Sequence, residues 1–179
     1  MTDDRVNARR DAVEEAAFRW GERYPGVAGF RALTALTRGY AVLVREAEVI
    51  LRPLGLNLSR FEVLMMLSFT RSAGLPMTRI RDLLTVHGSS VTYLVDRLTE
   101  AGWVTRAADP SDGRVSLVAI TPEGREVAEA AATSLAAADF GALRTLADAR
   151  LRQLGDLLAE LRRDPASDPA SGSGPSQGG

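Results

Sequence analysis

The chain has 179 residues, of which 45% are hydrophobic and 25% are charged, a composition typical of a globular protein with one packed domain. It has no cysteine and a single histidine, His87, which excludes disulfides and thiolate zinc sites and argues against a metal site or cofactor of that kind. The net charge is -1, without the basic excess typical of nucleic-acid binders, and all 22 basic residues are arginine.

The sequence predicts neither a membrane-spanning helix nor an export signal. No apolar run approaches the roughly 20 residues that a membrane-spanning helix needs. The charged amino-terminal segment lacks the apolar centre of a signal peptide, so we expect a cytoplasmic protein that does not contact the membrane. Residues 164–179 are rich in Pro, Gly and Ser and are expected to form a disordered tail.

Two helices are predicted before residue 55, because apolar residues recur there at helical spacing. The first covers about residues 11–24, and Pro25 and Gly26 end it. The second is longer and stops at Pro53 and Gly55. Its apolar stripe comprises Phe30, Leu33, Leu36, Tyr40, Leu43, Val44, Ala47, Ile50 and Leu51.

Two shorter helices are predicted next. Ser59 and Glu62 have the spacing of a capping box, which predicts a helix that begins at Ser59. Thr78 is predicted to cap the second helix, whose apolar side chains are expected to point inward. The apolar residues are Phe61, Leu64, Met65, Leu67 and Phe69 in the first helix, and Ile80, Leu83 and Leu84 in the second.

A third helix of this group is predicted after a turn at His87 and Gly88. Ser89 is expected to cap this helix, and Gly102 is expected to end it in the left-handed conformation. Its apolar stripe comprises Val91, Leu94, Val95 and Leu98.

Beyond Gly102 the pattern changes from helix to hairpin. Residues 104–106 and 115–120 read as strands, and the loop between them is dense in Asp, Pro and Gly. Thr121 then caps another helix with Pro122 at its first position. Helices are expected over about residues 122–138 and 141–163.

Short helices joined by a glycine turn and followed by a hairpin are typical of a winged helix-turn-helix. The predicted fold class is therefore mainly α, with a two-stranded wing and long amino- and carboxyl-terminal dimerisation helices. We assign residues 1–54 to amino-terminal dimerisation, 55–121 to DNA binding and 122–163 to carboxyl-terminal dimerisation. The leucine-rich terminal helices need a partner for their apolar faces, which a homodimer supplies by two-fold symmetry.

The face of the third helix opposite its apolar stripe carries the candidate DNA contacts. Its side chains are short donors and acceptors, one aromatic ring and one arginine, the types that bind base edges and phosphates. They are Ser89, Ser90, Thr92, Tyr93, Asp96 and Arg97. The alternative is an ordinary surface helix with a solvated polar face.

The hairpin adds three candidates: Arg106, Asp112 and Arg114. An arginine at a hairpin tip can enter the minor groove, where negative potential attracts a guanidinium group. The alternative is a solvated turn with incidental charges. Residues 78–114 contain five arginines and five acidic residues, so this segment has no net positive charge. DNA binding must therefore depend on where the individual arginines lie and not on an overall basic charge. The charged residues are Arg79, Arg81, Arg97, Arg106, Arg114, Asp82, Asp96, Glu100, Asp109 and Asp112.

Three passages in order resemble the MarR family of bacterial regulators: LSRFEVLMML, SSVTYLVDRLTEAGWVTR and DPSDGRVSLVAITPEG. The resemblance implies a dimer that places one recognition helix per subunit in the major groove of double-stranded DNA, with Arg114 in the minor groove. By position it implies DNA contacts from Ser89, Ser90, Thr92, Tyr93 and Arg97, while Asp112 orients the wing. The family often has arginine where Tyr93 stands.

The family resemblance also implies a small aromatic or anionic effector. The amino-terminal helix is similar to the extra helix of the urate-responsive branch, in which a tryptophan closes the ligand pocket. Trp20 and Glu62 match pocket positions of that branch, whereas Leu94 stands where the branch carries arginine. The alternative for Trp20 is simple packing of an amphipathic helix.

No phosphate-binding glycine loop, metal-ligand pair or nucleophile motif is visible, so the sequence does not predict an enzyme. His87 fits a capping or surface role better than catalysis. The predicted function is a transcriptional regulator, a repressor that binds a pseudo-palindromic operator as a homodimer. The alternative is a winged-helix module that binds another protein and no operator.

Overall fold

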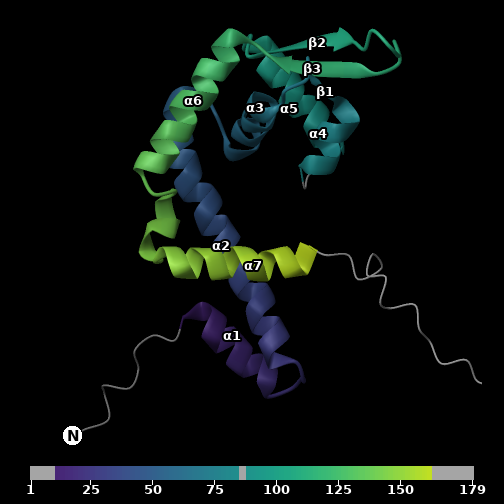
Figure 1. Ribbon diagram of the computed structural model, residues 1–179. Helices are drawn as coiled ribbons and strands as arrows, with labels where there is room; N and C mark the ends of the chain where they lie inside the picture. Colours follow the sequence, from purple (N-terminus) through teal and green to yellow (C-terminus); the bar gives the residue numbers. More distant parts are fainter. Residues whose placement is uncertain (1–10, 85–87, 163–179) are drawn as a thin grey trace, which may run out of the picture. The chain divides into compact units, whose positions relative to one another are not determined.

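The computed structural model describes residues 11–84 and 88–162, with the backbone alone for residues 88–90. It consists of two compact units, residues up to 142 and residues from 143 on. In chain order the elements are α1 (Ala12–Gly21), α2 (Val27–Leu51), the 3-10 turn η1 (Arg52–Leu54), α3 (Leu58–Phe69), β1 (Leu75–Pro76), α4 (Met77–Leu83), α5 (Gly88–Glu100), β2 (Val104–Ala108), β3 (Ser116–Ile120), α6 (Pro122–Ala137), the 3-10 turn η2 (Gly141–Thr145) and α7 (Asp148–Arg162) (Figure 1). The predicted fold class, mainly helical with a winged helix-turn-helix, is confirmed. None of the described helices is long and apolar enough to cross a membrane.

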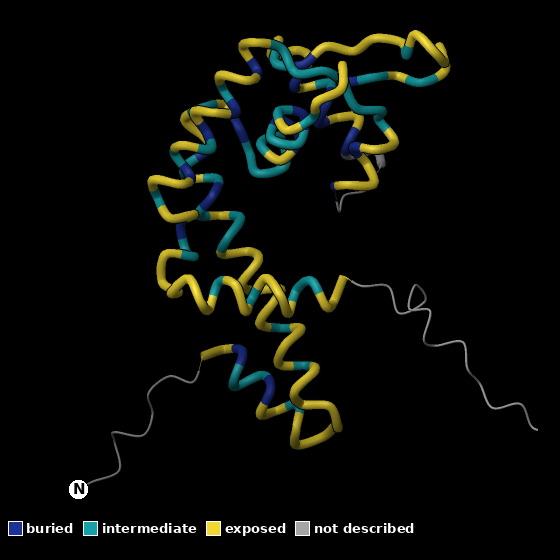
Figure 2. Tube along the Cα trace, viewed as in Figure 1, coloured by how far each residue is buried: buried dark blue, intermediate teal, exposed yellow. Residues whose placement is uncertain are grey.

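The core of the first unit lies among α3, α4, α5, the sheet and the facing ends of α2 and α6 (Figure 2). Its fully buried side chains are aliphatic, and they come from helices and strands alike. The largest of them are Leu51, Leu64, Ile80, Leu98, Val63, Val91, Val95, Val104 and Val118. Because these residues bind the three short helices to the sheet, the core fixes the position of α5.

The sheet has three strands in the order β1-β3-β2, and both pairings are antiparallel. The β2–β3 hairpin is the wing that the sequence predicts, with Val104 opposite Ile120 and Ala108 opposite Ser116. Strand β1, which pairs Leu75 with Val118, was not predicted from the sequence. A two-residue strand that contains a proline gives no alternating pattern, and proline is tolerated because β1 is an edge strand.

Three predicted helix caps are wrong. Helix α5 begins at Gly88, so the backbone of Ser89 is already helical. The side chain of Asn57, and not Ser59, accepts a hydrogen bond from the Arg60 amide at 2.9 Å and caps α3. Ser59 is already helical, so it cannot serve as the cap. Thr78 lies inside α4, whose N-cap position is occupied by Pro76 without a side-chain hydrogen bond.

Other helix ends agree with the sequence. Thr121 caps α6 by accepting a hydrogen bond from the Gly124 amide at 3.0 Å.

The predicted helix over residues 141–163 is divided into η2 and α7. Asp139, Phe140 and Gly141 all have positive φ angles of 46 to 67°, so the backbone turns sharply after α6. The predicted tail over residues 164–179 lies outside the described residues.

Leu83, which was predicted to point inward, is exposed, and so is the apolar side chain of Phe69. Leu83 in α4 is 46% exposed, and Phe69 at the end of α3 is 76% exposed. Each is the last residue of its helix, where the backbone leaves the helical path. In the same part of the chain Ile80 and Leu84 are buried, as predicted.

Candidate DNA-binding interface

Helix α5 has one buried and one exposed face, as the sequence predicts. The four side chains of its apolar stripe, Val91, Leu94, Val95 and Leu98, are at most 6% exposed. On the other face Thr92, Tyr93 and Arg97 are exposed. The side chains of Ser89 and Ser90, and the whole of His87, lie outside the described residues. The buried stripe therefore holds the helix in place while its polar face remains open to solvent.

The end of α5 is fixed by a Schellman motif. Gly102 has φ 75°, its amide donates to the Thr99 carbonyl, and the Trp103 amide donates to the Leu98 carbonyl, both at 2.9 Å. A residue with a β-carbon would be strained at this angle. Since β2 begins at Val104, this turn sets the direction in which the wing leaves the recognition helix.

Two candidate side chains on the exposed face contact each other. The Arg97 guanidinium lies 5.3 Å from the centre of the Tyr93 ring and donates to Glu100 at 2.7 Å. Tyr93 is 59% exposed, so this aromatic ring is presented to solvent beside a cation. The pair can stack on or donate to a nucleic acid, and Glu100 competes for the same arginine.

The loop of the wing is held by hydrogen bonds to two aspartates. Asp109 accepts from the amide and the hydroxyl of Ser111 at 2.8 and 2.6 Å, and these bonds lower the pKa of its carboxyl. Asp112 accepts from the Arg114 amide at 3.0 Å, the contact expected of a residue that orients the wing. Arg114 is exposed, and among the described residues none forms an ion pair or a hydrogen bond with its guanidinium group.

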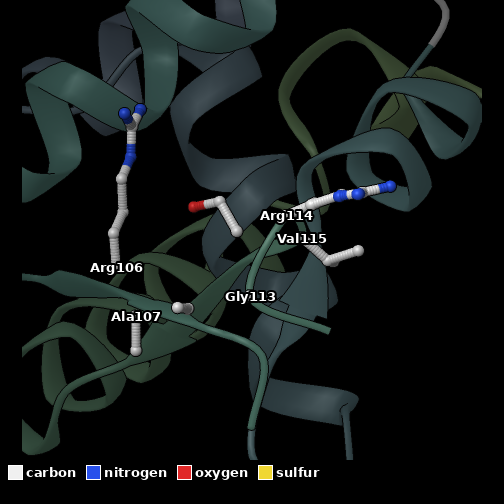
Figure 3. A pocket seen from close by; sticks show the side chains of 7 residues that line it. Arg106, Ala107, Gly113, Arg114 and Val115 are labelled. Atoms are coloured by element: carbon white, nitrogen blue, oxygen red, sulfur yellow. The ribbon is translucent and has the colours of Figure 1, made fainter. Parts of the chain in front are cut away.

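A shallow hollow of about 320 Å³ lies on the wing, lined in part by Arg106, Ala107, Gly113, Arg114 and Val115. Figure 3 shows that its two arginines extend in different directions: Arg106 runs from β2 toward a helix, and Arg114 points away from the loop. The hollow itself does not bring these two cations together. The two arginines that sequence analysis grouped as wing contacts thus have different surroundings.

Arg106 contacts the recognition helix. Its Nη2 atom lies 2.8 Å from Asp96 Oδ1 and 3.3 Å from the Thr92 carbonyl oxygen. The Arg106 side chain is 32% exposed and that of Asp96 is 49% exposed. The sequence predicts Asp96 on the exposed face of α5 but does not predict this contact, because no sequence spacing relates a helix residue to a strand residue beyond a turn.

The balanced charge of this region is explained by these contacts. Asp82, Asp96 and Glu100 each lie within 4 Å of an arginine, and Asp109 and Asp112 are used by the wing loop. The acids are therefore engaged within the protein, while Arg114 keeps its charge available at the wing tip. The region can therefore have equal numbers of acidic and basic residues and still present a positive charge, that of Arg114, at the tip of the wing.

The two residues suggested for an effector pocket lie on different helices. Trp20 in α1 donates from Nε1 to the Pro25 carbonyl at 2.8 Å and stacks on Phe30 at 4.3 Å between ring centres. This is the packing role that was the alternative for Trp20. Glu62 lies on α3, where desolvation raises the pKa of its carboxyl. A hollow of about 270 Å³ beside Trp20 is lined by α1 residues and the following turn, without Glu62. The effector stays a prediction.

Helix α5 has one buried and one exposed face, it follows the short helix α4, and it precedes a hairpin with an exposed arginine near its tip. This combination defines the class of winged helix-turn-helix DNA-binding proteins. A profile of the MarR family matches residues 54–115. The HTH-type transcriptional repressor Rv2887 of Mycobacterium tuberculosis is 34% identical over 129 residues, which cover 72% of this chain and 91% of the relative. The chain belongs to the MarR family of transcriptional regulators. It is a DNA-binding regulator and not an enzyme.

Solved structures agree with this assignment. Sco5413, a MarR family transcriptional regulator from Streptomyces coelicolor, has a TM-score of 0.70 and 37% identity, covering 76% of this chain and 94% of its own. CouR from Rhodococcus jostii RHA1, solved with p-coumaroyl-CoA, has a TM-score of 0.63 and 29% identity, covering 75% of this chain and 90% of its own.

Proposed function

We propose that the protein is a homodimeric repressor that binds a pseudo-palindromic operator. Helix α5 lies in the major groove of each half-site, and Arg114 enters the adjacent minor groove. The observation that carries this proposal is the pairing of an exposed Thr92, Tyr93 and Arg97 face with a buried aliphatic face on the same helix. Repression is supported by the similarity to Rv2887, which is named a repressor.

The homodimer is supported by apolar side chains that a single chain leaves exposed. On α2, Leu33 is 64% exposed, Leu36 39% and Tyr40 67%, and their spacing places them on one side of the helix. Helix α7 has no buried residue among those described, and its Leu161 is 70% exposed. Apolar faces of this kind are typical of interfaces between subunits.

The proposal also includes a small aromatic or anionic effector that releases the operator. Support comes from the similarity to CouR, whose structure has been solved with p-coumaroyl-CoA. In this reading the effector would act on the dimer and not on the wing contacts, because the wing hollow is shallow and solvent-facing.

Loss of Arg114 tests the DNA contact. The operator is first identified by a pulldown of genomic DNA with the purified protein. We expect Arg114→Ala to weaken operator binding by about 1–3 kcal/mol and to reduce the slope of log affinity against log salt concentration by about 0.9, because one phosphate-region cation is lost. Arg97→Ala is expected to weaken binding to a similar extent and to relax base preference.

The matched control is Arg45→Ala, which removes a 70% exposed arginine from α2, away from the proposed interface. Affinities are measured by fluorescence anisotropy over a salt series. Operator binding that is the same in all three variants and the wild type would contradict the proposal. It would mean that the DNA contacts lie elsewhere on the protein, whereas a pulldown that yields no specific operator would favour the alternative of a protein-interaction module.

Charges on the α2 stripe test the dimer. We expect the double variant Leu33→Glu, Tyr40→Glu to be monomeric at micromolar concentration and to lose tight operator binding, because one subunit can contact only one half-site. The control is Val49→Glu, since Val49 is 65% exposed on the same helix but lies about 160° around it from Leu33. Sedimentation velocity distinguishes the two states. A double variant that stays dimeric would place the interface elsewhere.

A further inference from the structure

We infer that Arg106 and Asp96 form a positioning link that holds the wing in a fixed orientation to the recognition helix, and that Arg106 does not act as a phosphate contact. This inference rests on the proposed function and refines it. It concerns which arginines bind DNA and which prepare the protein to do so.

The register of the sheet puts Arg106 on the side that faces the helices. Arg106 stands opposite Val118 in the β2–β3 pairing, and directly paired residues of an antiparallel sheet point to the same side. Val118 is fully buried, and Val104, two residues before Arg106, is 1% exposed. Because alternate residues of a strand share a side, Arg106 leaves the sheet on the side of the core.

The guanidinium group then meets two acceptors on one helix. Nη2 is 2.8 Å from the Asp96 carboxylate and 3.3 Å from the Thr92 carbonyl, one helical turn apart on α5. Figure 3 shows the side chain running from the strand to a helix, unlike that of Arg114. With a carboxylate and a carbonyl already bound, Arg106 is held within the protein.

In addition to the packing of the core, the link joins the wing to α5 at a point away from the turn at Gly102 that connects them along the chain. That turn lies at the carboxyl end of α5, whereas Thr92 lies in its first half. Two separated connections restrict rotation of the wing about the turn. A preformed angle between wing and helix lowers the ordering cost of binding two grooves at once.

The direction in which Asp96→Ala changes operator affinity shows whether Arg106 positions the wing or contacts a phosphate. If Asp96 only neutralised a DNA-binding arginine, its removal would delete a negative charge near DNA and tighten binding. If Asp96 holds the wing in place, its removal weakens binding in spite of the favourable change in charge. We expect Asp96→Ala and Arg106→Ala each to weaken operator binding about five- to tenfold. The double variant is expected to lie within about twofold of either, because both changes break one link.

The salt dependence gives a second readout. Arg106→Ala is expected to keep the wild-type slope of log affinity against log salt, whereas Arg114→Ala reduces it by about 0.9. The matched control is Asp82→Ala, which removes the same carboxylate from an exposed ion pair with Arg81 that lies within α4 and connects no other element. This control is expected to leave operator binding unchanged or slightly tighter.

Amide hydrogen exchange of the free, full-length protein provides a readout that needs no DNA. We expect amides of β2 and β3 to exchange faster in Asp96→Ala and Arg106→Ala, equally and without further acceleration in the double variant. If no operator is found, the proposed function fails, while equal acceleration still supports the link. Tighter or unchanged binding in Asp96→Ala, additive losses, a reduced salt slope in Arg106→Ala, or unchanged exchange in both single variants would overturn the inference.

Discussion

Replacing Gly124 by alanine is expected to destabilise the protein by about 3 kcal/mol or more and to disrupt the wing. A β-carbon at Gly124 would lie 2.0 Å from the Trp103 carbonyl oxygen and 2.8 Å from its carbonyl carbon. Both atoms belong to the backbone, so no side-chain rotation can relieve the overlap.

The same corner is tied by hydrogen bonds that limit any backbone shift. The Trp103 carbonyl accepts from the Thr121 amide at 3.0 Å, and the Thr121 hydroxyl donates to the Gly102 carbonyl at 2.8 Å. Moving the first turn of α6 away would therefore break the junction between α5, β2 and α6. We expect operator binding to fall together with stability.

Urea unfolding followed by far-ultraviolet circular dichroism measures this loss. Gly155→Ala in α7 is the matched control, because nothing lies within 4 Å of its β-carbon position. Alanine there is expected to be neutral or to stabilise the helix by up to about 1 kcal/mol. Unfolding of Gly124→Ala at the wild-type urea concentration would show that the corner can open without cost, contrary to this expectation.

Truncating Leu98 to alanine is expected to lower the free energy of unfolding by about 2–5 kcal/mol. Leu98 is 0% exposed and lies in the second half of α5, where it packs in the core. The truncation leaves a cavity beneath the recognition helix, so we also expect faster amide exchange along α5 and weaker operator binding.

Leu83→Ala makes the comparison sharp, since it removes the same atoms from a side chain that is 46% exposed on α4. Its cost is expected to stay below about 1 kcal/mol. Thermal and urea unfolding of both variants check the difference. Equal losses would mean that exposure of Leu83 does not describe its energetic role.

Much of the fold could be predicted because local physics determines it. The stripe of Val91, Leu94, Val95 and Leu98 has helical spacing, and it is buried as predicted. Gly102 ends its helix in the left-handed conformation, and Thr121 caps α6, because each such feature depends on neighbours within a few residues.

Errors in the predicted helix starts also have a local origin. Asn57 and Ser59 are both of residue types that cap helices well, and Asn57, the nearer of the two to the η1 turn, takes the N-cap position. The sequence contains both candidates and gives no means of choosing between them. The same holds for Leu83, whose apolar character suits the core although the short α4 helix turns it outward.

The sequence by itself determined the class of fold, the recognition helix and the wing, because periodicity, caps and turn residues act over short distances. Only the tertiary structure decided that β1 completes the sheet, that Gly124 must lack a β-carbon, and that Arg106 binds Asp96 while Arg114 does not. These features join residues that are distant along the chain, and the packing of the core decides which of them meet.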